Sequence, residues 1–86
     1  MKPIQDYSEE EIEKSCETVG LKFVEMFDNL TKQYPTVIVA AAMAGAFAAS
    51  IIANGLDQRG AIEGVMGAFS NIENNPFNPR SKKNLN

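Results

Sequence analysis

Histidine and tryptophan are absent from this 86-residue sequence, and cysteine occurs once, as Cys16. One cysteine excludes a disulfide within the chain, and without histidine or a cysteine pair there is no zinc-type ligand set. The absence of histidine also removes the commonest general base and the usual activator of a serine or cysteine nucleophile. The sequence therefore predicts a protein that is not an enzyme and that binds no metal or cofactor.

Positive charge is scarce as well. Eight Lys and Arg residues stand against 11 Asp and Glu residues, which gives a net charge of -3. A nucleic-acid footprint needs clustered Lys and Arg, so we expect no nucleic-acid partner. The last cations, Arg80, Lys82 and Lys83, fall within residues 80–86, which we expect to be a disordered basic tail. The acidic start has no signal-peptide pattern and the unpaired Cys16 suits a reducing compartment, so we expect a cytoplasmic protein.

Large apolar side chains are few for a chain that has to form a core. Hydrophobic residues make up 44% of the sequence, but ten of them are alanines, each of which buries little area. A chain of this size buries only about 60 to 65% of the surface that its unfolded form exposes. Small folds are usually stabilised further by disulfides, a metal or oligomerisation, and only oligomerisation is open to this sequence. We therefore expect a single domain, residues 1–79, that forms a homo-oligomer.

The first helix is predicted over residues 8–33. Ser8 and Glu11 form a capping-box pattern, in which each side chain bonds to the other residue's backbone amide. Pro35 ends the helix because a proline restricts the residue before it. Apolar residues recur between these ends at spacings of four and three, the pattern of a packing seam. They are Ile12, Cys16, Val19, Phe23, Met26 and Leu30, with Phe27 beside them.

The second helix is predicted over residues 35–54, between Pro35 and the helix-ending pair Asn54 and Gly55. It contains 18 residues without a charge, 36–53, among them eight alanines. A helical wheel separates its large side chains from its small ones. The large ones are expected to pack against the first helix: Val39, Met43, Phe47 and Ile51. The small ones are expected to let another helix approach to roughly 8 Å: Ala42, Gly45, Ala46, Ala49 and Ala53.

The third helix is predicted over residues 58–74, with Asp57 as its N-cap. Each glycine inside it costs roughly 1 kcal/mol relative to alanine. Gly60, Gly64 and Ala68 share one face, so we expect that face to dock closely on the small side of the second helix or of its copy in another subunit. In the alternative, Gly60 lies in a longer loop and the helix begins at the next residue. The apolar stripe of this helix is Ile62, Val65, Met66, Phe69 and Ile72.

The uncharged run 36–53 also meets the minimum length of a membrane span, and Ala41, Gly45 and Ala49 follow the small-residue pattern of membrane helix pairs. Alanine and glycine give little partition energy, and no aromatic belt or pair of Lys/Arg clusters brackets the run. The apolar seam of the first helix would also lose its partner. A single-span, holin-like membrane protein is therefore the alternative to a soluble one.

Two groups of residues are candidate contacts for other molecules. Asn54, Asp57 and Arg59 lie where the third helix begins, and free backbone amides beside an arginine suit an anion or a nucleotide phosphate. The acidic outer face of the first helix and the aromatic residue of the C-terminal segment are candidate contacts for another protein. These partner-binding candidates are Glu10, Glu13, Glu17 and Phe77.

The sequence thus predicts an all-α protein, a small three-helix bundle with an Ala/Gly-rich central helix, that assembles as a homo-oligomer and acts by binding another protein. Its size, acidic charge and lack of catalytic groups suit an accessory protein or inhibitor encoded by a phage or mobile element. The alternative functions are an oligomer that sequesters a small anionic ligand between its subunits and the membrane protein described above. The predicted self-association residues are Ala42, Gly45, Ala46, Ala49, Ala53, Gly60, Gly64 and Ala68.

Overall fold

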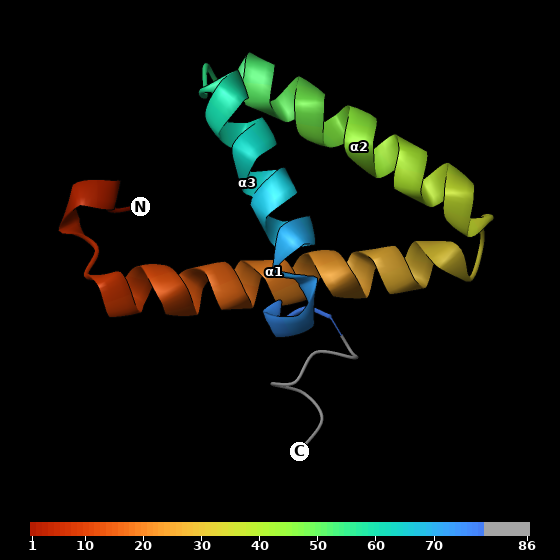
Figure 1. Ribbon diagram of the computed structural model, residues 1–86, viewed down its shortest axis with the longest axis horizontal. Coiled ribbons are helices and arrows are strands. Elements are labelled where there is room, and N and C mark those ends of the chain that lie inside the picture. The colour runs from red at the N-terminus through yellow and green to blue at the C-terminus, as the bar shows by residue number, and fades with distance from the viewer. Residues whose placement is uncertain (79–86) are drawn as a thin grey trace.

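The computed structural model describes residues 1–78, and within this range it is helical with no strand (Figure 1). The all-helical class with three α-helices that the sequence predicts is confirmed for the described residues. The predicted basic tail, residues 80–86, lies outside them. The elements are η1 (Ile4–Asp6), α1 (Glu9–Thr31), α2 (Thr36–Ala53), α3 (Gln58–Ser70) and η2 (Ile72–Asn74).

The start of α1 has the predicted capping box. Ser8 is the N-cap: its Oγ accepts a hydrogen bond from the Glu11 N–H at 3.1 Å, and Glu11 Oε1 accepts one from the Ser8 N–H at 3.2 Å. The helix ends at Thr31, before the predicted residue 33. The N–H groups of Lys32 and Gln33 bond to carbonyls three residues back, so the last turn tightens and stops.

α2 ends in a Schellman motif, which satisfies two of its last carbonyl groups. The Gly55 N–H bonds to the Ile52 carbonyl at 3.1 Å, and the Leu56 N–H bonds to the Ile51 carbonyl at 3.0 Å. Gly55 has a φ of 64°, a left-handed conformation that glycine adopts without the steric cost of a Cβ. The predicted helix end at this glycine is confirmed.

α3 begins as predicted, with Asp57 as its N-cap. Asp57 Oδ2 accepts a hydrogen bond from the Gly60 N–H at 3.1 Å. Gly60 lies inside the helix, so the alternative start at Ala61 is wrong. The helix ends at Ser70, earlier than predicted, because asparagine side chains beyond it offer the chain local hydrogen bonds and η2 follows.

The three α-helices form the sides of an open triangle (Figure 1). α1 and α2 meet at the short connection between them, and α2 and α3 meet at the turn around Gly55. The triangle closes where the segment after α3 returns to α1, because the Phe77 ring lies against Gly20. Each helix therefore contacts its neighbours near a few points and leaves most of its length uncovered.

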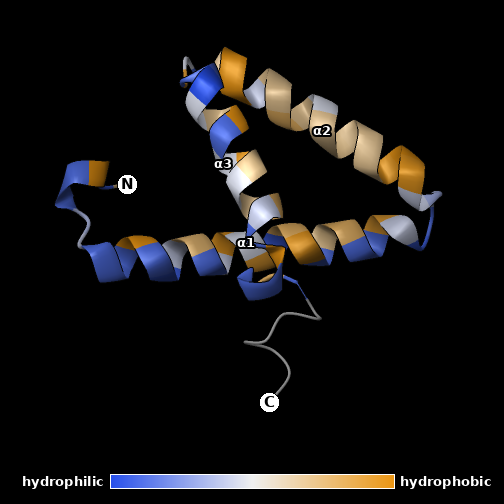
Figure 2. Cartoon of the chain, viewed as in Figure 1, coloured by the Kyte–Doolittle hydropathy of each residue, from blue (hydrophilic) through white to orange (hydrophobic). Residues whose placement is uncertain are grey.

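Little apolar surface is buried inside this triangle. Val39 is the one hydrophobic residue of the described chain that is fully buried, although Figure 2 shows hydrophobic residues along the whole of α2. The predicted packing of the large α2 side chains on α1 is therefore wrong for Met43 and Phe47, which remain 47% and 45% exposed. The physical reason is that α2 diverges from α1 after its first turns (Figure 1). The other contact of α1 is made by the segment after α3, through the Phe77 ring.

Candidate interaction surfaces

An apolar groove lies between α2 and α3. Its volume is about 630 Å³, and Gln58 is the one polar residue in its lining. No residue of α1 lines it. The sequence predicted the apolar stripes of both helices but not that they would face an open groove. The large side chains of the apolar groove include Met43, Phe47 and Ile51 of α2 and Ile62, Val65 and Met66 of α3.

The small residues of α2 lie on the opposite side of the helix, roughly half a turn from the groove on a helical wheel. All five are exposed, and a Cβ built at Gly45 would meet no atom within 4 Å. The described part of the chain therefore leaves this side uncovered, and its role in self-association stays a prediction. We call it the small face: Ala42, Gly45, Ala46, Ala49 and Ala53.

Glycines of α3 face open space in the same way. A Cβ at Gly64 or Gly67 would meet no atom within 4 Å, whereas at Gly60 it would lie 2.9 Å from Asp57 Oδ2, where glycine makes room for the cap. The expected docking of Gly60, Gly64 and Ala68 on the small face of the same chain is wrong, because α3 turns its groove side toward α2. Docking on a second copy stays a prediction. Gly67 lies on the same side of α3 as Gly60, Gly64 and Ala68, although it is not four residues from any of them. We call these four residues the glycine side of α3.

Only one side of α1 is partly buried in the described fold. Its partly buried residues, Gly20, Val24, Phe27 and Thr31, follow one another at spacings of four, three and four. The predicted apolar seam is rotated by roughly a quarter turn from this stripe. It stays exposed, with Phe23 58% and Val19 51% accessible. We call it the free seam: Ile12, Cys16, Val19, Phe23, Met26 and Leu30.

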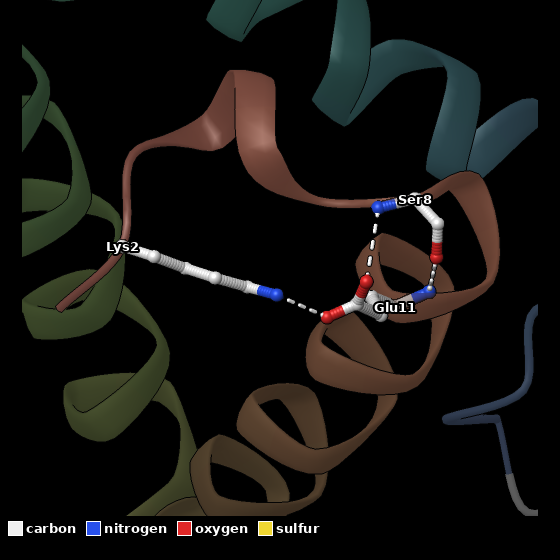
Figure 3. Close-up of polar contacts among 3 residues, drawn as sticks. All are labelled: Lys2, Ser8 and Glu11. Atoms are coloured by element: carbon white, nitrogen blue, oxygen red, sulfur yellow. Dashed lines mark hydrogen bonds and ion pairs between the residues drawn. The ribbon is translucent and has the colours of Figure 1, made fainter.

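The acidic start of α1 is tied to the N-terminal segment. Lys2 Nζ donates a hydrogen bond to Glu11 Oε2 in an ion pair, and the other carboxylate oxygen of Glu11 accepts from the Ser8 N–H (Figure 3). The bond from Lys2, followed by the bond from the Ser8 backbone, holds the pKa of Glu11 below its ordinary value. This carboxylate therefore stabilises the start of α1.

The residues predicted to bind another protein are only partly free. Glu10 Oε1 lies 3.4 Å from Lys14 Nζ, one turn further along α1. Glu13 and Glu17 are exposed on the outer face. Phe77 is partly buried against α1, so a partner that used its ring would have to displace it.

The residues predicted to bind an anion have local structural roles. Asn54 Nδ2 donates to the Ser50 carbonyl at 2.8 Å, and the Asp57 carboxylate accepts at the first turn of α3, where an anion would have to bind. Arg59 Nε lies 3.9 Å from Glu63 Oε1, with both side chains largely exposed. The three residues lie near the same corner, and the apolar groove is lined by none of them. Anion binding stays a prediction.

Residues 1–78 contain no group of three or more His, Cys, Asp or Glu side chains arranged to hold a metal ion. Comparison of the chain with protein-family models, with curated proteins and with solved structures gave no significant match.

Proposed function

We propose that this protein is a non-enzymatic helical binding protein that self-associates through the small face and the glycine side of α3 and acts by binding another protein, as an accessory protein or inhibitor does. The observation that carries the proposal is the exposure of most of the large apolar side chains of residues 1–78. Apolar patches of this extent on a water-soluble protein mark interaction sites.

The exposed area supports self-association. The chain has 7380 Å² of accessible surface, against roughly 5000 Å² for a compact protein of its mass. The residues after 78 would account for about 1400 Å² when counted at the area of an unfolded chain. Against the compact area of the whole mass, residues 1–78 therefore carry a surplus of at least roughly 1000 Å². Two copies that cover this surplus bury about 2000 Å², which is in the range of specific protein interfaces.

The uncovered glycines indicate which sides a second copy covers. Gly45, Gly64 and Gly67 lie inside helices and have open space where a Cβ would be. Each costs roughly 1 kcal/mol relative to alanine, and no contact within residues 1–78 offsets it. The close approach of another helix backbone is an arrangement that glycine permits and a larger residue prevents.

The decisive experiment is the molar mass of the purified chain by light scattering, without detergent. We expect a discrete oligomer, and we expect the combined substitutions Gly45→Leu and Ala49→Leu to lower the mass because they overfill the small face. Gly45→Ala is the matched control, since it keeps that face small and should preserve the oligomer. A wild-type monomer, or an unchanged oligomer in the double leucine variant, contradicts the proposal.

A second candidate function, a single-span membrane protein, is favoured by one observation on α2. Thr36–Ala53 has a mean hydropathy of 2.2 over 18 residues and only 6% of it is buried, unlike the core helix of a soluble protein. Its length of about 27 Å is close to the thickness of a bilayer's hydrocarbon core. Recovery of the protein only in the detergent-extracted membrane fraction would favour this function over the first.

A further inference from the structure

We propose that the free seam of α1 packs into the apolar groove of a second copy, and that the second copy returns the same contact. The inference rests on the proposed self-association and gives it a surface distinct from the small face. The groove and the small face lie on opposite sides of α2, so one contact leaves the other available.

The α1 helix of the same chain is held away from the groove at two points. One is the short connection to α2, beside which Val39 is buried. The other is the contact of Phe77 with Gly20, near the middle of α1. Between these points α1 forms the third side of the triangle, across the open ends of α2 and α3 (Figure 1). It presents its partly buried stripe to the fold, and the large residues of the free seam stay exposed, from 36% at Leu30 to 58% at Phe23.

The free seam has the chemistry that the groove requires. An apolar groove between two helices accepts an amphipathic helix whose anchors recur at spacings of three and four. Val19, Phe23 and Met26 follow this spacing and are 51%, 58% and 54% exposed. The groove offers apolar side chains of both α2 and α3, with Gln58 as the one polar residue. One chain therefore presents both surfaces of a helix-in-groove contact, the exposed free seam and the apolar groove.

Charge favours this pairing over a contact between two α1 helices. α1 carries seven acidic residues and two lysines between Glu9 and Thr31, so two copies of it side by side repel each other. α2 has no charged residue, and the groove lining has none from α3 either. The acidic face of α1 stays in water when its opposite side, the free seam, enters the groove. Because each copy supplies one seam and one groove, the exchange is two-fold symmetric and closes as a dimer.

The single cysteine of the chain allows a direct test, since Cys16 lies in the free seam and is exposed. Wild-type protein is co-expressed with a differently tagged variant that carries Cys16→Ser and Ala44→Cys, so that a disulfide between the two tags has to join the seam of one copy to the groove of the other. Ala44 lines the groove. The matched control replaces Ala44→Cys by Ala42→Cys, the same change on the small face of the same helix.

After mild oxidation we expect a disulfide-linked dimer that carries both tags when the variant has Ala44→Cys. We expect no such dimer when the variant has Ala42→Cys instead. An oligomer by light scattering that gives no such disulfide overturns the seam-to-groove contact while self-association stands. A monomer by light scattering overturns both proposals. A further variant with Ala44→Cys alone keeps Cys16 in the same chain; a disulfide formed only within such chains shows closure of α1 onto its own groove and overturns the inference, as does recovery of the protein in membranes alone.

A second pair of variants tests the same contact without cysteine chemistry. Phe23→Glu places a charge in the free seam, and Leu21→Glu places one on the opposite side of α1. The two side chains are similarly exposed, at 58% and 51%, so Leu21→Glu is a matched control for the effect of the charge on the single chain. We expect Phe23→Glu to lower the molar mass of the oligomer and Leu21→Glu to leave it unchanged. An equal effect of the two substitutions contradicts the inference.

Discussion

Gly20→Ala is expected to destabilise the protein even though it removes a glycine from the interior of a helix. A Cβ at this position would overlap the Phe77 ring, which closes the triangle by packing on α1. The ring therefore has to move away when the methyl group is added. In a chain that already lacks the Phe77 ring the added methyl group meets no such obstacle. Gly20→Ala should therefore stabilise that chain.

The magnitudes follow from two opposing contributions. Alanine is favoured over glycine inside a helix by about 1 kcal/mol. Truncation of a fully buried phenylalanine costs about 3 to 5 kcal/mol, so loss of the contact of the partly buried Phe77 costs about 2 kcal/mol. Gly20→Ala should thus destabilise the wild-type chain by about 1 kcal/mol and stabilise a Phe77→Ala chain by about 1 kcal/mol, a coupling of about 2 kcal/mol.

Urea unfolding followed by the helical circular dichroism signal, with the four chains at one protein concentration, measures this cycle. Gly67→Ala is the control, because nothing lies within 4 Å of a Cβ there and its effect should be the same with and without Phe77. If the effects of Gly20→Ala and Phe77→Ala add to within about 0.5 kcal/mol, the two residues do not share a contact and the closure of the triangle is refuted.

Two further predictions concern the helix starts. Asp57→Ala should destabilise the protein by about 1 kcal/mol in the same urea experiment, because the Gly60 N–H loses its acceptor, while Asp57→Asn should restore most of the loss; equal stability of the alanine and asparagine variants would show that the cap is not used. Because the folded state lowers the pKa of Glu11 below its ordinary value of 4.5, the contribution of Glu11 to stability is present above the unfolded-state pKa and is lost as the pH falls through the lower folded-state value. Lys2→Ala removes the largest cause, so the NMR titration midpoint of the Glu11 carboxyl group should move upward, and an unchanged midpoint would count against the ion pair.

The ends of the helices could be predicted from the sequence because they depend on neighbouring residues. Ser8 and Glu11 satisfy each other's amides, Asp57 accepts from the turn that follows it, and Gly55 provides the left-handed residue of a Schellman motif. None of these interactions needs a distant partner, so the local pattern is sufficient. The end of α3 was predicted too far along the chain because the apolar spacing continues to Ile72, whereas the helix ends at Ser70 and the short 3-10 helix η2 follows.

The packing between helices could not be predicted from the same pattern. Hydrophobic spacing indicates which side of a helix is apolar, but not which apolar side it will meet. α1 has the free seam and, a quarter turn away, the stripe with Val24 and Phe27, and the fold uses the stripe. The choice depends on Phe77 and Gly20, which are far apart in the sequence and carry no pattern that links them. The open groove between α2 and α3 could not be predicted for the same reason.

The contact between Phe77 and Gly20 also sets the order in which the fold is completed during synthesis. α1 and α2 leave the ribosome before Phe77 does, so for that interval the middle of α1 has no attachment and the distance between α1 and α3 is not fixed. The triangle acquires its third corner only when the residues after η2 have emerged. A nascent chain therefore exposes its apolar helices before the contact that fixes the distance between α1 and α3 has formed.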